Sequence, residues 1–317
     1  MTLTAIATIL AFVLTAIGMR LLIPTLIKFK FGQQIREDGP KHHLLKQGTP
    51  TMGGIAMVLG FFAVAMVFAW DSPEALAIML VTAGFGLIGF FDDFIKIKRK
   101  RSLGLRVYQK IIGQLLISVA FVMFWRTLPS YSTEVLLPFF LVTIDIGRLF
   151  PVFVCLVFLS SANGANLTDG LDGLASGVTV IIATFFLAMA IWAFNSPIAP
   201  AIGAKIGALL GFLLYNSHPA RVYMGDTGSL ALGGFVAAVA LFLGMPLFLF
   251  IVAIIYVIES MSVIIQVGYF KFTKGKRFFK MAPIHHSFEL SGWAETKIVA
   301  LFMIITAVAC MVALIGF

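Results

Sequence analysis

Acidic residues stand close together in three segments of this chain. GFFDDFIKIKRK contains the adjacent pair Asp92 and Asp93, NLTDGLDGL contains Asp169 and Asp172, and MGDTGS contains Asp226. Carboxylates that meet around one cleft repel each other unless a cation lies among them. Mg²⁺ suits such a set, because it binds one or two protein carboxylates and leaves its other positions to water and substrate phosphates. The segments therefore predict a magnesium site for a phosphorylated substrate.

Basic residues and glycines near these acids could bind phosphate. Lys96 stands four residues after Asp92, which would place both side chains on one face of a helix. Lys110 ends the same basic stretch, and the adjacent pair His285 and His286 follows in MAPIHHSFE. Glycine-rich turns beside helix N-termini also hold phosphate through their N–H groups. Phosphoryl transfer depends mainly on positioning and electrostatics, so these residues favour a phosphoryl transferase.

Several other chemistries are poorly supported. The chain has no HExxH motif and no Walker motif, and both cysteines, Cys155 and Cys310, stand in apolar runs. Zinc catalysis, an ATP-driven machine and a disulfide framework are therefore not indicated. Each acidic segment on its own could be a helix cap or a solvated helix end. Their occurrence together favours a shared site.

The elements that must position these residues belong in a bilayer. Of the 317 residues, 60% are hydrophobic and 12% are charged, and the mean hydropathy is +1.03. A soluble domain carries about 25% charged residues, and a membrane helix needs about 20 apolar ones. We predict an all-α polytopic membrane protein, a single transferase domain over residues 1–317. Its ten transmembrane helices are expected at 3–27, 52–70, 75–94, 107–126, 149–163, 172–194, 199–215, 229–244, 247–270 and 297–316.

The net charge of +9 reflects topology rather than a nucleic-acid partner. Residues 28–50, 95–110 and 271–295 contain five, seven and five Lys or Arg residues, whereas 127–148 contains only Arg148. Basic residues collect in cytoplasmic loops. Both termini are therefore expected outside the cytoplasm, and every polar cluster is expected at the cytoplasmic face. Residues 127–148 are expected to form a small hairpin on the outer side.

Five segments carry a resemblance to a known family. TPTMGG, FFDDFIK, NLTDGLDGL, NSHPARVYMGDTGSL and MAPIHHSFE closely resemble, in this order, the motifs of the phospho-N-acetylmuramoyl-pentapeptide transferases. These belong to the polyprenyl-phosphate N-acetylhexosamine-1-phosphate transferase superfamily, and the resemblance covers essentially the whole chain. It implies a bacterial inner-membrane enzyme, usually a homodimer, with ten helices and an active site at the cytoplasmic face. The implied reaction is Mg²⁺-dependent transfer of phospho-MurNAc-pentapeptide from UDP-MurNAc-pentapeptide to undecaprenyl phosphate, giving lipid I and UMP in peptidoglycan synthesis.

The resemblance also implies residue roles. Asp226 would be the principal magnesium ligand, Asp92 would act on the lipid phosphate, Asp93 would organise the site, and Lys96 would contact phosphate. His285 and His286 match a catalytic C-terminal histidine motif, in which Ser287 replaces a usual third histidine. Tyr223 stands where the family commonly has a phenylalanine that stacks on uracil. The substrate-binding residues would be Lys46, Thr51, Lys110, Asn166, Asp169, Gly170, Leu171, Asp172, Asn216, Tyr223 and Gln266.

Alternatives remain at this point. A GlcNAc-1-phosphate transferase would use related motifs, and a lipid-linked transporter would place polar residues near the midplane of repeated halves. A two-step route would use an aspartate nucleophile. We favour direct attack, because a phosphate monoester has a second pKa near 6 and needs little help from a base. Glu259 within the ninth span is either functional or a paired structural residue. Arg20 and Lys205 are expected to snorkel or to be locally paired.

Overall fold

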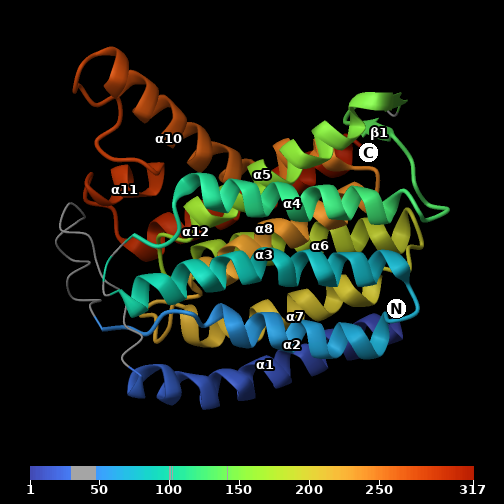
Figure 1. Cartoon of the computed structure of the whole chain (residues 1–317), viewed down its shortest axis with the longest axis horizontal. Helices are drawn as coiled ribbons and strands as arrows, with labels where there is room; N and C mark the ends of the chain where they lie inside the picture. The colour runs from blue at the N-terminus through green and yellow to red at the C-terminus, as the bar shows by residue number, and fades with distance from the viewer. Residues whose placement is uncertain (30–47, 100, 102, 141) are drawn as a thin grey trace.

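The computed structural model describes residues 1–29, 48–99, 101, 103–140 and 142–317, and these form a helical bundle (Figure 1). Its long helices are α1 (Thr2–Lys28), α2 (Gly54–Phe68), α3 (Pro73–Lys98), α4 (Val107–Trp125), α5 (Phe150–Thr168), α6 (Leu174–Trp192), α7 (Ala199–Asn216), α8 (Gly225–Phe242), α10 (Ile254–Phe272) and α12 (Glu295–Ile315). Shorter elements are α9 (Leu249–Val252), α11 (Ile284–Glu289), the 3₁₀ turns η2 (Gly147–Leu149) and η3 (Pro246–Phe248), and the strands β1 (Glu134–Leu137) and β2 (Val142–Asp145).

The predicted all-α membrane architecture is confirmed. Within the described ranges, nine helices are long and apolar enough to cross a bilayer, and α2 is a shorter apolar helix of 15 residues. Each predicted span overlaps one of these ten helices. Helices suit the bilayer because all their backbone hydrogen bonds are internal. The two strands pair antiparallel, with Glu134 opposite Asp145, and form the hairpin expected between residues 127 and 148.

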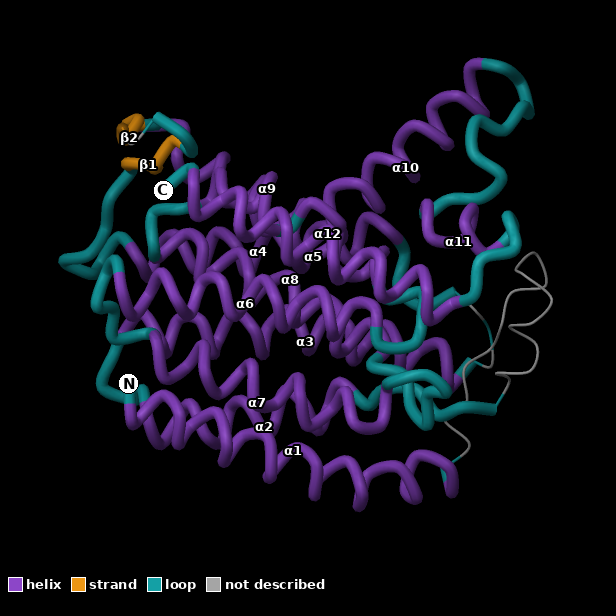
Figure 2. Tube along the Cα trace, turned by 180° about the vertical axis from the view of Figure 1, so that it is seen from behind, coloured by secondary structure: helices purple, strands orange, loops and turns teal. Residues whose placement is uncertain are grey.

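The ninth predicted span, 247–270, is wrong as one continuous helix. The chain turns through η3 and α9, and Ala253, at φ −100° and ψ 32°, separates α9 from α10. The break lets α10 lean away from the bundle, as Figure 2 shows.

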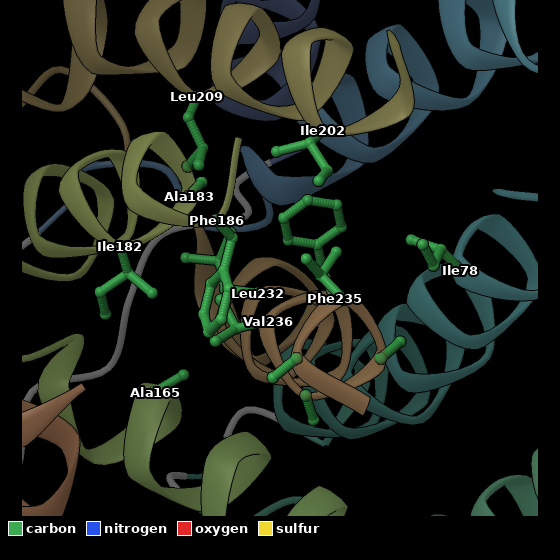
Figure 3. Packing of buried hydrophobic residues seen from close by; sticks show 14 of the residues in the cluster. Ile78, Ala165, Ile182, Ala183, Phe186, Ile202, Leu209, Leu232, Phe235 and Val236 are labelled. Carbon is green, nitrogen blue, oxygen red and sulfur yellow. The ribbon is translucent and has the colours of Figure 1, made fainter. Parts of the chain in front are cut away.

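Helix α8 forms the centre of the bundle. Every residue from Thr227 to Leu241 is buried, so the helix is covered on all sides. In Figure 3, Leu232, Phe235 and Val236 of α8 lie among side chains of α6 and α7. Helices approach closely in membranes where small residues face each other. A Cβ on Gly89 of α3 would lie 2.0 Å from the carbonyl oxygen of Asp226, so α3 and α8 meet almost backbone to backbone.

The two ends of the bundle differ in character. Both termini and the β-hairpin lie at one end, and α11 with the loops that precede α4, α6 and α8 lies at the other (Figures 1 and 2). The acidic segments of the sequence are thus carried to a single end. An even number of membrane crossings would produce this arrangement.

Candidate active site at one end of the bundle

Asp92 lies in the C-terminal part of α3, about two turns before its end, and is fully buried. Its Oδ2 is 2.6 Å from Nζ of Lys96, one helical turn later, as the spacing in the sequence predicted. Its Oδ1 accepts a hydrogen bond of 2.7 Å from the backbone N–H of Leu105. A Cβ on Gly104 would lie 2.4 Å from that oxygen, so only glycine lets the loop before α4 fold onto the carboxylate. Asp92 is therefore held from two sides.

Asp93 caps the N-terminus of the central helix. Its Oδ2 accepts hydrogen bonds from the N–H of Thr227, at 2.9 Å, and from the Thr227 hydroxyl, at 2.8 Å. Its Oδ1 accepts the N–H of Asp226 at 3.2 Å. N–H groups in the first turn of a helix have no partner inside the helix, and a carboxylate satisfies them well. Gly225, with a positive φ of 70°, allows the close approach.

Asp226 meets two lysines that also contact Asp92. Nζ of Lys110 lies 2.5 Å from Asp226 Oδ2 and 3.1 Å from Asp92 Oδ1. Nζ of Lys96 lies 3.2 Å from Asp226 Oδ1 and 3.7 Å from Asp93 Oδ1. Three carboxylates from α3 and α8 thus surround two ammonium groups, which come from α3 and α4. The cluster retains one formal negative charge in excess.

The donor set of this cluster fits a hard divalent cation. Oxygen atoms of Asp92, Asp93 and Asp226 lie within 4.8 Å of one another. Carboxylate oxygens are what Mg²⁺ prefers, and few protein ligands are needed when phosphates supply the rest. The Asp226 side chain is the most exposed of the three, at 16%, and its oxygens contact the two lysines, whereas both oxygens of Asp93 accept hydrogen bonds from the donors of Asp226 and Thr227. The three carboxylates could together hold a metal ion, and Asp226 is the most accessible of them.

Asp169 stands at the C-terminal end of α5, next to this cluster. Burial, followed by the charges of Asp226, Asp93 and Asp172, raises the pKa of the Asp169 carboxyl well above its ordinary value. A neutral carboxylic acid can donate a hydrogen bond as well as accept one. The next residue, Gly170, leaves room for His285, whose Nε2 would lie 2.1 Å from a Cβ at that position.

The histidine pair is held by two glutamates. Nδ1 of His285 lies 3.0 Å from Oε1 of Glu259 on α10, and both side chains are buried. Nδ1 of His286 lies 2.6 Å from Oε2 of Glu289. Nε2 of His285 has no hydrogen-bond partner among the residues that the structure describes. The buried acid of the ninth span is therefore a paired residue that orients an imidazole.

Ser287 closes the loop that leads into α11. Its hydroxyl donates to the carbonyl oxygen of Met281 at 2.5 Å, and its oxygen accepts the N–H of Met281 at 3.1 Å. Both hydrogen bonds join the short Ser287 side chain to the backbone of Met281. The position of the usual third histidine thus has a structural role in this chain.

A second polar cluster lies at the same end. Oδ2 of Asp172 accepts the N–H of Ala220 at 3.0 Å and lies 3.1 Å from Nδ1 of His218. Oε1 of Glu295, in the first turn of α12, accepts the N–H of Asp172 at 2.7 Å. Burial, then the charges of Asp172 and Glu295, raises the pKa of the Tyr223 phenol above its ordinary value. Tyr223 therefore remains an uncharged ring.

The other predicted site residues occupy different positions. Asn216 and Leu171 are buried, and the Asn216 amide donates to the carbonyl of Val222 at 3.0 Å. Asn166 donates to the hydroxyl of Ser229 at 2.8 Å. A Cβ on Gly225 would lie 2.9 Å from the Thr51 hydroxyl oxygen, which places Thr51 beside the acidic cluster.

Two predicted substrate residues are not brought into these clusters by any described contact. Oε1 of Gln266 accepts the N–H groups of Phe278 and Phe279, at 3.2 and 2.9 Å, and so ties α10 to the loop after it. Lys46 lies outside the described residues. Their roles in substrate binding stay predictions.

Sequence reasoning missed two contributors. Leu105 acts through its backbone N–H, which no side-chain pattern reveals. Glu295 stands in the first turn of α12, where an acid is common, so its place in the sequence gives no signal of its contact with Asp172. A bundle of membrane-length helices with carboxylates, lysines and histidines gathered at one end defines a polytopic membrane protein with a single polar, acid-rich end.

Comparison with known proteins narrows this class. Residues 75–244 match the model described as glycosyl transferase family 4, and residues 46–58 match phospho-N-acetylmuramoyl-pentapeptide-transferase signature 1. Proteins named phospho-N-acetylmuramoyl-pentapeptide-transferase from Clostridium kluyveri and Clostridioides difficile (strain 630) are both 48% identical, over 97% of this chain and 97% and 96% of their own lengths. One from Caldanaerobacter subterraneus is 47% identical over 97% of this chain. The chain belongs to the phospho-N-acetylmuramoyl-pentapeptide-transferase family.

Proposed function

We propose that this protein transfers phospho-MurNAc-pentapeptide from UDP-MurNAc-pentapeptide to undecaprenyl phosphate, giving lipid I and UMP in peptidoglycan synthesis. The observation that carries the proposal is the group Asp92, Asp93, Asp226, Lys96 and Lys110, in a chain of this family. It combines carboxylate oxygens that can bind Mg²⁺ with two lysine ammonium groups that can bind the phosphates of a substrate. Bound at Asp226, Mg²⁺ would supply charge stabilisation for the pyrophosphate.

The reaction exchanges one phosphoanhydride for another. An oxygen of the lipid phosphate forms a bond to the β-phosphorus of the UDP-sugar, and the bond from that phosphorus to the bridging oxygen breaks. UMP leaves with the electron pair. Lys96 and Lys110 would neutralise the oxygens on which charge develops. Asp92, held by Leu105, would orient the lipid phosphate or take its residual proton.

The contacts of Asp92 support a single step. A covalent nucleophile needs a free oxygen directed at the phosphorus. Oδ1 of Asp92 accepts the N–H of Leu105 and lies 3.1 Å from Nζ of Lys110, and Oδ2 forms an ion pair with Nζ of Lys96 at 2.6 Å, so both oxygens are engaged by donors or cations. Because the lipid phosphate is largely dianionic at neutral pH, it can attack without a covalent intermediate.

The loops around the second cluster would bind the nucleotide. A protonated Asp169 could donate to a uracil oxygen, and the Tyr223 ring could stack on the base. Asp172 and Asn216 would fix the loops that carry these two residues, through Ala220 and Val222. His285, oriented by Glu259 and packed beside Gly170, would contact the pyrophosphate or the sugar.

We further propose that the acidic end faces the cytoplasm of a bacterial cell and both termini face outward, with homodimers as the assembly. Lys98 and Ser130 are exposed at opposite ends of the bundle and report orientation. A membrane-impermeant thiol reagent on intact cells should label Ser130→Cys and spare Lys98→Cys. The reverse labelling would overturn the orientation.

The substrate assignment is tested with purified protein, Mg²⁺ and undecaprenyl phosphate. UMP release should be fast with UDP-MurNAc-pentapeptide and slow with UDP-GlcNAc, and Asp226→Asn provides the inactive control. Equal rates with the two sugar nucleotides would reject this branch of the superfamily and support the GlcNAc-1-phosphate alternative.

A further inference from the structure

A cavity of about 320 Å³ lies apart from both polar clusters, between the last turns of α1 and α7. It is lined by Arg20, Ile23, Pro24, Tyr215 and Arg221. Two of these five residues are arginines, contributed by α1 and by the loop that follows α7. A cavity with two cations and a wall that is partly apolar, at Ile23 and Pro24, is suited to an amphipathic anion.

Neither guanidinium is neutralised by a carboxylate of the described residues. Arg221 lies over the Tyr215 ring, with Cζ 5.7 Å from its centroid, and Arg20 is exposed. The sequence led us to expect Arg20 to be snorkelling or locally paired, and no ion pair forms within the described ranges. Uncompensated cations that share one cavity attract an anion, and guanidinium groups bind phosphate oxygens in a bidentate manner.

The walls of the cavity are positioned by the backbone. The Tyr215 hydroxyl donates to the carbonyl oxygen of Ala16 on α1 at 3.1 Å, which fixes the ring between the two helices. The N–H of Arg221 donates to the carbonyl oxygen of Tyr215 at 2.8 Å, so the loop folds back over the end of α7. Pro24 has no N–H, and the carbonyl of Arg20 therefore lacks its helical donor.

The position of the cavity matches the headgroup level of a bilayer. Tyr215 is the last residue but one of α7, and tyrosines favour the membrane interface. On α1, the exposed side chains of Ile17, Leu21 and Ile27 offer an apolar surface beside the cavity. A molecule with acyl chains could lie along that surface while its phosphate reaches the arginines. A small soluble anion would leave it unused.

We propose that this cavity binds the phosphate headgroup of an anionic phospholipid, from the leaflet that faces the acidic cluster. Basic pockets between membrane helices recognise such headgroups. The phosphodiester of a lipid such as phosphatidylglycerol would accept hydrogen bonds from the guanidinium groups of Arg20 and Arg221. The inference does not depend on the proposed reaction.

The site adjoins the loop of the proposed nucleotide pocket. Arg221 is followed by Val222, which accepts from Asn216, and by Tyr223, whose N–H donates to the carbonyl of Pro50 at 2.8 Å. A lipid held at Arg221 would therefore stabilise the conformation of residues 217–224.

Native mass spectrometry of the purified full chain tests the site. The protein is titrated with dioleoyl phosphatidylglycerol, with dioleoyl phosphatidylcholine and with inorganic phosphate. The pocket variant combines Arg20→Gln with Arg221→Gln, and the matched control combines Lys98→Gln with Arg99→Gln at the same end of the bundle. We expect phosphatidylglycerol to bind wild type and control alike, and the pocket variant at least about tenfold more weakly, because two phosphate contacts are lost. Phosphatidylcholine binding should be unchanged throughout.

Three results would overturn the proposal. The pocket variant could bind phosphatidylglycerol as wild type does, or the control could lose as much binding as the pocket variant. Inorganic phosphate could also bind by itself and depend on the two arginines, which would make a free anion the ligand. If the double variant does not fold, Arg221→Gln alone, on an exposed loop, should give a partial loss. An unchanged affinity in that variant would be equally decisive.

Discussion

Asp93 has two possible roles, as a helix cap or as a metal ligand, and the substitution Asp93→Asn separates them. The carboxylate satisfies three donors, two from Thr227 and the N–H of Asp226. Asparagine keeps one acceptor oxygen and presents an NH₂ group in place of the other. If the remaining oxygen stays with Thr227, the N–H of Asp226 faces another donor.

The cost follows from these contacts. A buried N–H without an acceptor costs about 1–3 kcal/mol. Loss of a negative charge at a helix N-terminus costs about 0.3–1 kcal/mol, and up to ~2 when partly buried. We expect a total of about 2–4 kcal/mol and a melting temperature lower by roughly 5–10 °C. Because Asp226 would shift with its backbone, UMP release should fall about 10²-fold or more.

The assay combines thermal unfolding, turnover and a Mg²⁺ titration of the rate. Thr227→Val is the graded control, since it removes the hydroxyl donor but keeps both N–H bonds, and it should lower stability less and retain most activity. If Asp93→Asn left the melting temperature at the wild-type value while abolishing activity and raising the Mg²⁺ requirement, Asp93 would be a direct ligand. The capping account would then be wrong.

Three further predictions concern Asp169, Glu259 and Lys205. Burial and neighbouring charges raise the pKa of Asp169 in the folded protein. Its contribution to the free energy of unfolding is therefore complete below about pH 4 and is lost as pH rises through the folded pKa. Asp169→Asn should flatten this decline of the unfolding free energy with pH, and an unchanged pH profile would contradict the prediction. Glu259→Leu should lower turnover and alter its pH profile, because the His285 ring loses its partner. Glu259→Gln still accepts a hydrogen bond from Nδ1 of His285 and should retain most activity. Equal defects in the two variants would argue against the role of Glu259 in orienting His285. The Lys205 ammonium lies 5.1 and 5.7 Å from the ring centroids of Phe61 and Phe235 without a hydrogen-bond partner in the described chain. A charge buried in the membrane costs about 2.5–3.5 kcal/mol, and desolvated cation–π contacts offset ~2 kcal/mol of this cost. Lys205→Met should therefore raise the melting temperature by about 2–4 °C. A lower melting temperature would show that the cation–π contacts outweigh the cost of burying the charge.

The helices were predictable because the bilayer leaves few alternatives. Apolar segments of sufficient length must become helices in lipid, and hydropathy alone located each of them. The turn from Pro246 to Ala253 was missed because the residues on both sides of it are equally apolar. Hydropathy reports that a segment is buried in lipid or protein, but not that its direction changes. The lean of α10 depends on that change.

The contacts of the site that involve charged side chains were predictable from the sequence, and those that involve backbone groups were not. The spacing of Asp92 and Lys96 on one helix predicted their contact directly. The acids of α3 and α8 were predicted to lie at the same end of the bundle, and there they contact one another's lysine partners. The capping contact from Asp93 to Thr227 joins residues far apart in the chain, so it needed the packing of α3 against α8. Backbone donors such as Leu105 leave no mark in a sequence.

The measurement that tests the account most directly is UMP release in the presence and absence of the lipid acceptor. Purified protein with Mg²⁺ and UDP-MurNAc-pentapeptide should release UMP when undecaprenyl phosphate is added, with one lipid-linked phospho-MurNAc-pentapeptide formed for each UMP. Without the lipid it should release none, and mass spectrometry should find Asp92 unmodified. UMP released without lipid, together with a phospho-MurNAc adduct on Asp92 that forms and discharges at the rate of turnover, would contradict the single-step transfer.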